Sequence, residues 1–170
     1  MKRTPLLGLI GLFFLAACAA PAPIRTGPDG QPLPQVYQIP SSRSDEVKFN
    51  MLDGVNVLRS EQGLPPVEFD AALIAAAATH SRDMSVQNRP WHFGSDGSSP
   101  LDRVARVGYD GQLLGENISE TYETELETLA AWMAKPDTKG VILDPAARRM
   151  GFSWHQERTG KIWWTLILGT

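Results

Sequence analysis

The sequence predicts an α+β fold in which a small antiparallel sheet lies between two layers of helices. Two observations carry this prediction. The segment 162–168 is apolar on both faces, and such a strand belongs to a sheet that is covered on both sides. Strand patterns are scarce in this chain while amphipathic helical patterns are frequent, so helices must supply both covers. The expected architecture is therefore an α-β-α sandwich.

The first 17 residues have the pattern of an export signal. Two basic residues precede a run over residues 6–17 that is almost wholly apolar, and its 12 residues are too few to span a membrane. The run ends directly before Cys18, the only cysteine. Residues 15–18 (Leu-Ala-Ala-Cys) resemble a bacterial lipobox, which implies cleavage before Cys18 and stable membrane attachment through its acyl chains. An ordinary cleaved signal with a chance cysteine is the alternative.

Residues 18–44 are predicted to be a tether between the membrane and one domain over residues 45–170. Six prolines stand between positions 21 and 40. Because proline removes backbone donors and fixes φ, this stretch can neither form a central strand nor continue a helix. Removing residues 1–17 leaves 14 basic against 19 acidic residues, a net charge of −5. With no basic stripe either, nucleic acid is not an expected partner.

Two helices are predicted at the start of the domain. From Asp45, apolar residues recur at spacings of three and four, until Gly63 and a pair of prolines end the pattern. Asp70 is the predicted N-cap of a second, alanine-rich helix over residues 71–87. His80 lies on the apolar stripe of that helix, where we expect a core histidine that is bonded to a neighbour.

Shorter elements follow. A short helix capped by Ser99 is predicted to end at Gly108, and residues 113–119 read as a strand. A third long helix covers about residues 124–134, and a proline stops it. The last predicted element is a hairpin with strands at 150–155 and 162–168 around the turn 157–160. The periodicity of these elements predicts core positions for Trp132, Trp163 and Trp164.

The candidate site combines His92 with Glu116. His92 is one of three histidines and lies in the loop 90–100 between two aromatic residues, while Glu116 lies on the predicted strand. A histidine that faces a carboxylate can order a loop through its N–H, or it can act in general acid–base catalysis. We expect the first. Trp91 and Asp96 come from the same loop, and Trp91 either packs in the core or stacks on a ligand.

Motifs for a catalytic nucleophile are absent from the sequence. Residues 151–155 depart from the hydrolase elbow because His155 replaces the required glycine, and they lie in a predicted strand. His155 is expected at the surface beside the hairpin turn. Cys18 offers no free thiol once it is lipidated. Neither a zinc-protease motif nor a phosphate-binding glycine loop occurs.

Seven short motifs, in their order along the chain, resemble the CAP superfamily, which includes the cysteine-rich secretory proteins, antigen 5 and the plant pathogenesis-related proteins. They are Gly-Leu-Pro-Pro (63–66), Ala-Thr-His-Ser-Arg-Asp-Met (78–84), Trp-His with Ser-Asp-Gly (91–97), Gly-Glu-Asn-Ile (115–118), Trp-Met (132–133), Val-Ile-Leu-Asp-Pro (141–145) and Trp-Trp-Thr (163–165). The resemblance covers about residues 47–169 and implies the α-β-α sandwich of that superfamily.

The resemblance also implies a cleft. In the superfamily two histidines and two glutamates line it, and some members bind a divalent metal there. His92 and Glu116 match one residue of each kind, but Thr138 stands where the second histidine would be. Zinc is held by three or four strong ligands. We therefore predict no cofactor; if a divalent metal did bind, His92 and Glu116 would be its candidate ligands.

Together these patterns predict a CAP-like lipoprotein of the bacterial cell envelope, held in the outer membrane by Cys18 and facing the periplasm. Its expected role is non-catalytic binding of a small or lipidic ligand or another envelope component. The predicted ligand cleft consists of Trp91, His92, Asp96, Glu116 and Thr138. The alternative is a hydrolase of peptides or cell-wall material, with Glu116 as the base and His92 as its partner.

Overall fold

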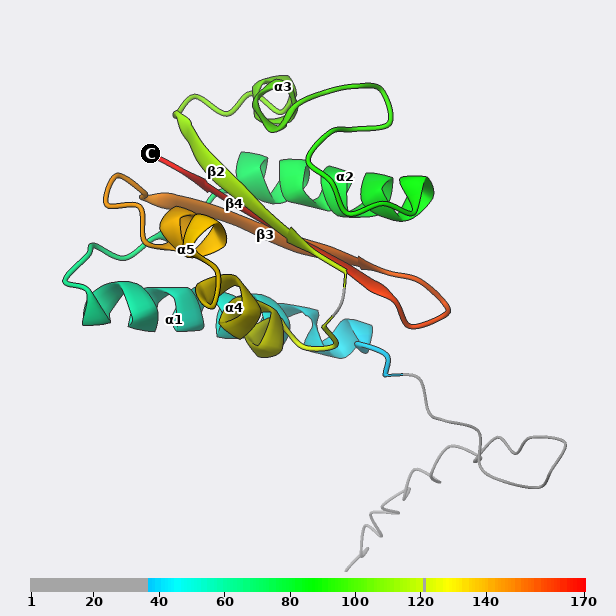
Figure 1. The fold of residues 1–170 in the computed structure, drawn as a ribbon, viewed down its shortest axis with the longest axis horizontal. Coiled ribbons are helices and arrows are strands. Elements are labelled where there is room, and N and C mark those ends of the chain that lie inside the picture. The colour runs from blue at the N-terminus through cyan, green and yellow to red at the C-terminus, as the bar shows by residue number, and fades with distance from the viewer. Residues whose placement is uncertain (1–36, 121) are drawn as a thin grey trace, which may run out of the picture. The chain divides into compact units, whose positions relative to one another are not determined.

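The structure is a computed structural model and describes residues 37–120 and 122–170. In these residues two layers of helices enclose a four-stranded sheet, so the predicted α-β-α sandwich is confirmed (Figure 1). The predicted signal peptide, Cys18 and most of the tether lie outside the described residues. Within the described part, no helix has the length and apolar character needed to cross a membrane.

The elements agree closely with the predicted ones, with three additions. In chain order they are the 3-10 helix η1 (Ser41–Arg43), α1 (Ser44–Glu61), β1 (Glu68–Phe69), α2 (Ala71–Gln87), α3 (Pro100–Arg106), β2 (Leu113–Ser119), α4 (Glu125–Met133), α5 (Pro136–Ile142), β3 (Arg149–Gln156) and β4 (Ile162–Gly169). The sequence did not predict η1, β1 or α5. Pro136 follows α4 as expected, but it also occupies the first turn of α5, where its fixed φ suits a helix and its missing N–H costs nothing.

The sheet has the order β1-β3-β4-β2. The three long strands are antiparallel, whereas β1 adds a parallel edge of two residues beside β3. Every residue of β4 is buried, because this strand lies inside the sheet and is covered on both faces. The doubly apolar pattern of residues 162–168 therefore has the cause that was predicted for it.

The two faces of the sheet belong to different helices. Figure 1 shows α1, α4 and α5 below the sheet and α2 with α3 above it. The lower core contains Met51, Trp132 and Trp164, while the smaller upper core contains Leu73 and Ile167. Trp163 is also fully buried, so the predicted core positions of all three tryptophans are confirmed.

Helix α2 lies very close to β3. A Cβ atom added to Gly151 would come within 2.2 Å of the backbone carbonyl carbon of Leu73. The helix starts at the predicted cap, because the Asp70 side chain accepts a 2.9 Å hydrogen bond from the Leu73 N–H. Ser81 donates a 2.9 Å hydrogen bond to the buried Thr165 hydroxyl on β4. These contacts fix the helix that carries His80.

The domain begins before residue 45, the predicted boundary. Tyr37 and Ile39 pack against the lower core. The Gln156 side chain accepts a hydrogen bond from the Ile39 N–H and donates one to the Tyr37 carbonyl, both at 2.9 Å. The extended backbone before Pro40 is thus hydrogen-bonded to a side chain of β3. Residues 37–44 therefore belong to the domain.

Candidate functional site

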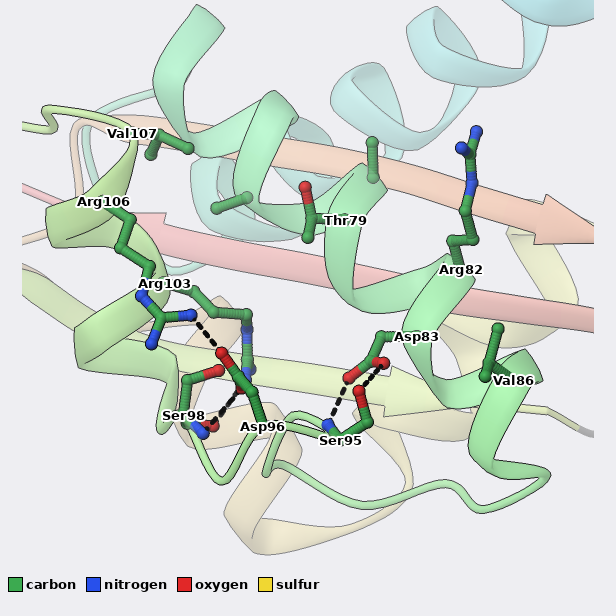
Figure 2. Close-up of a pocket in the computed structure, with 12 residues that line it drawn as sticks. Thr79, Arg82, Asp83, Val86, Ser95, Asp96, Ser98, Arg103, Arg106 and Val107 are labelled. Atoms are coloured by element: carbon green, nitrogen blue, oxygen red, sulfur yellow. Dashed lines mark hydrogen bonds and ion pairs between the residues drawn. The ribbon is translucent and has the colours of Figure 1, made fainter.

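The loop between α2 and α3 carries three of the predicted site residues, and α2 holds it from one side. Asp83 on α2 accepts hydrogen bonds from the Ser95 N–H and hydroxyl, at 2.7 and 2.6 Å (Figure 2). Asp96 accepts bonds from the Ser98 N–H at 2.9 Å and from Arg106 at 2.5 Å. Hydrogen bonds from Ser98 and Arg106 hold the pKa of Asp96 well below its usual range. Asp96 therefore shapes the loop.

Glu116 on β2 is the centre of the site. Its side chain is only 2 % exposed. One nitrogen of the Arg103 guanidinium donates to both carboxylate oxygens, at 2.9 and 2.7 Å. His92 donates from Nδ1 to Oε1 of the same carboxylate at 2.9 Å. The structure thus brings the predicted pair His92 and Glu116 together and adds an arginine from α3.

Arg103 ties the loop to the sheet as well as pairing with Glu116. Its second terminal nitrogen donates to the backbone carbonyls of His92 and Ser98, at 2.9 and 3.1 Å. The residue is only 5 % exposed. Sequence reasoning missed this arginine. The sequence does hold one indication of a buried arginine: in a helix that begins at Pro100, Arg103 lies next to the apolar Val104, on the side that faces the sheet.

His80 on α2 completes the buried cluster. It is fully buried, as predicted, and its Nε2 lies 3.6 Å from Oε1 of Glu116. Among the described residues neither ring nitrogen has a hydrogen-bond partner, so the expected bond to a neighbour is not formed. Burial lowers the pKa of His80, although the Glu116 charge opposes this effect. Neutral imidazole is the favoured form.

The surroundings of Glu116 keep it ionised. Burial by itself would raise the pKa of this carboxyl group. The hydrogen bond from His92, together with the charge and the hydrogen bonds of Arg103, outweighs burial and lowers the pKa below its ordinary value. A carboxylate with a low pKa and both oxygens bonded is a poor general base.

The donor set does not fit a divalent metal. In residues 37–120 and 122–170, no three His, Cys, Asp or Glu side chains are grouped so that they could hold a metal ion. His92 Nδ1 and Glu116 are bonded to each other, and the Arg103 guanidinium places a positive charge beside the carboxylate. A cation at Glu116 would have to displace that guanidinium.

Thr138 does not lie with the other predicted cleft residues. Its hydroxyl donates to the Trp132 carbonyl at 2.6 Å, and its own carbonyl accepts from the Asn117 side chain at 2.8 Å. Asn117 pairs with a residue of the lower core, whereas Glu116 pairs with Ile167 of the upper core. Because adjacent strand residues point to opposite faces, Thr138 contacts the sheet from the face opposite to Glu116. Its predicted place in one cleft with Glu116 is corrected accordingly.

Trp91 is half-buried and packs within its own surface region. Its Nε1 donates to the Gln87 side chain at 2.7 Å. The Arg89 guanidinium lies 3.8 Å from the centre of its ring, and the Phe93 ring lies 5.6 Å away. The indole therefore belongs neither to the upper nor to the lower core. It packs at the C-terminal end of α2, next to the half-exposed Phe93.

A groove of about 620 Å³ lies between α2 on one side and the loop with α3 on the other (Figure 2). Its volume is within the range of small-molecule sites. The lining residues are Ala76, Ala78, Thr79, Arg82, Asp83, Val86, Ser95, Asp96, Ser98, Arg103, Arg106 and Val107. Of the five predicted cleft residues it includes only Asp96. The loop that carries His92 thus forms one wall of the groove, and Arg103 of α3 also lines it.

Comparison with known proteins identifies the family. The sequence profile of the cysteine-rich secretory protein (CAP) family matches residues 52–168. The uncharacterized protein YkwD of Bacillus subtilis is 31 % identical over 130 residues, which are 76 % of this chain and 49 % of YkwD. The uncharacterized membrane protein YlbC of the same organism is 29 % identical over 101 residues, 59 % of this chain and 29 % of YlbC. The chain therefore spans about half or less of the length of these relatives.

Two solved structures share the fold. An outer surface protein of Borrelia burgdorferi has a TM-score of 0.69 at 15 % identity, over 80 % of this chain and 98 % of that one. An extracellular protein of Bacillus anthracis that contains an SCP domain has a TM-score of 0.65 at 22 % identity, over 75 % of this chain and 44 % of that one. The profile match over residues 52–168 shows that the chain belongs to the CAP family, and the two structures show that it shares their fold.

Proposed function

We propose that this chain is a non-catalytic binding module of the bacterial envelope, which takes a small or lipidic ligand beside the loop that carries His92. One observation carries the proposal. Both oxygens of Glu116 are bonded, to Arg103 and to His92, and the side chain is 2 % exposed. The carboxylate that would have to act as a base is therefore committed to holding the loop against the sheet.

The surface beside the loop supports binding. The groove of about 620 Å³ combines apolar residues such as Val86 and Val107 with the polar Ser95 and Asp96. Small-molecule sites commonly have this mixture of apolar lining and a few placed polar groups. The loop wall is held by Asp83 on one side and by Arg103 on the other, so it is largely formed before a ligand arrives.

We further propose attachment to the outer membrane through a lipidated Cys18. The supporting observations are the apolar run and the small residues before Cys18. The descriptions of similar proteins agree with an envelope location, since they include an outer surface protein and an extracellular protein. Labelled palmitate should enter the wild-type chain and not Cys18→Ser, which should no longer fractionate with the membrane. Equal labelling of both would contradict the anchor.

The binding role is tested by isolating the protein from its own envelope fraction and analysing bound lipids, small molecules and metals. A co-purifying organic ligand that is lost when Val86→Asp places a charge in the apolar part of the groove supports the proposal. A protein that carries no ligand, and whose thermal midpoint no envelope extract raises, would contradict it. Arg158→Gln, in the turn between β3 and β4, is the matched surface control.

The alternative function is a hydrolase, and one observation favours it. His92 is half-exposed, and a buried carboxylate orients its ring, which is how histidine bases are often held. Incubation with peptide, ester and peptidoglycan substrates distinguishes the two functions. Turnover by the wild-type domain that disappears in Glu116→Gln would favour the hydrolase. A binding module gives no turnover in either protein.

A further inference from the structure

Two histidines lie close to the same oxygen of Glu116, and only one of them is bonded to it. His92 Nδ1 is 2.9 Å from Oε1, while His80 Nε2 is 3.6 Å from that atom. The second distance is too long for a hydrogen bond. A movement of about 0.7 Å, the difference between these two distances, would bring His80 to the distance that His92 now has.

His80 has donor capacity that the rest of the domain leaves unused. Within the described residues neither of its ring nitrogens is hydrogen-bonded, although the residue is fully buried. The Trp91 backbone raises the pKa of His80 as a hydrogen-bonding neighbour would, but neither ring nitrogen has a partner with full hydrogen-bond geometry. A buried polar group without a partner is unfavourable and calls for an explanation. A bond that forms in a second conformation would supply one.

His92, unlike the buried His80, lies partly at the surface. Its side chain is 50 % exposed, so the ring can turn toward solvent. Its backbone cannot follow, because the carbonyl accepts a 2.9 Å hydrogen bond from Arg103. Such a rotation would leave Glu116 with Arg103 as its one bonded side chain. A buried carboxylate that loses a hydrogen bond is costly unless another donor replaces the one that left.

We propose that His80 is a reserve partner for Glu116, which takes over the bond of His92 whenever the half-exposed His92 ring turns outward, away from the carboxylate. The exchange keeps Glu116 paired throughout and so lowers the cost of freeing His92. Two charged or titratable groups besides the two histidines belong to the cluster, Glu116 from β2 and Arg103 from α3. His80 is thus a positioning residue. The exchange does not depend on the proposed function.

A double-mutant cycle tests the exchange. His92→Ala leaves His80 as the replacement, and His80→Leu leaves His92 in place, so each single change should affect stability only modestly. The double variant has neither donor. Relative to wild type, each variant raises the unfolding equilibrium constant by some factor. The factor for the double variant should exceed the product of the two single-variant factors by roughly tenfold, the lower end expected for a hydrogen bond to a charged group. Effects that simply multiply would overturn the proposal. His92→Ala combined with His155→Ala is the control, and those two effects should multiply.

Nitrogen NMR of the three histidines gives a second readout that does not depend on unfolding. In His92→Ala, the Nε2 signal of His80 should move toward the position of a hydrogen-bonded donor, and in His155→Ala it should not move. An unchanged His80 signal in His92→Ala would overturn the reserve role. This measurement uses the free protein. If the exchange is seen but no ligand is ever found, the proposed function fails and the exchange stands.

Discussion

Replacing Arg103 with methionine should be among the most damaging single changes in this domain. The change removes the guanidinium that donates to both Glu116 oxygens and to the carbonyls of His92 and Ser98. Methionine nearly fills the space but leaves a buried charge with His92 as its one bonded partner. Breaking a buried ion pair from one side costs about 3–5 kcal/mol. We therefore expect Arg103→Met to lower the free energy of unfolding by that amount in urea titrations.

Two further variants show whether the charge is the cause. Arg106→Met, on the same helix three residues later, removes an ion pair with Asp96 in which both side chains are more than half exposed, so it should change stability little. The double variant Arg103→Met with Glu116→Gln should recover part of the loss, because no charge is left unpaired. A cost below about 1 kcal/mol for Arg103→Met would refute the view that this buried pair holds the loop to the sheet.

Three other predictions concern the carboxylate and the packing of α2. The pKa of Glu116 is lower in the folded state than in the unfolded state. The stabilisation that its charge gives to the fold is therefore fully present above pH 4.5 and is lost as the pH falls through the folded-state pKa. The difference in free energy of unfolding between wild type and Glu116→Gln should shrink over that range in chemical denaturation. Gly151→Ala should destabilise the domain by about 1–3 kcal/mol, since its methyl group would meet the Leu73 backbone. Gly140→Ala, on a helix with open space around it, should stabilise the domain by about 0.5–1 kcal/mol. Equal effects of the two changes would refute the close contact at Gly151. Asp70→Ala should cost about 1 kcal/mol through loss of the α2 cap, and an unchanged thermal midpoint would contradict this role.

The parts of the fold with strong local signals could be predicted from the sequence. Residues 71–87 form a helix between the expected ends because Asp70 caps it and alanines favour it. Strand β2 likewise spans residues 113–119 as predicted. β1 was missed because two residues carry no periodicity and because its pairing with β3 is set by tertiary structure. α5 was missed because a proline that ends one helix can also begin the next.

The candidate site was only partly predictable. His92 and Glu116 were paired correctly, since both stand in distinctive short motifs. Arg103 was overlooked because an arginine in a short polar helix looks like a surface residue until its neighbours are placed. His80 was expected in the core, but the absence of a bond to its ring could be seen only from the geometry of the described residues. Thr138 was misplaced because matching a position in a motif does not say which face of the sheet its side chain contacts.

The most direct test of a structural, non-catalytic Glu116 is a carbon NMR titration of its side-chain carboxyl group in the intact domain. A carboxylate held by Arg103 and His92 predicts a midpoint below the ordinary value of 4.5 and no further step near neutral pH. Arg103→Met should move that midpoint upward, because burial would then act with less opposition. A wild-type Glu116 that titrates near neutral pH would contradict the structural role and would instead describe a carboxyl group that is ready to act as a general base.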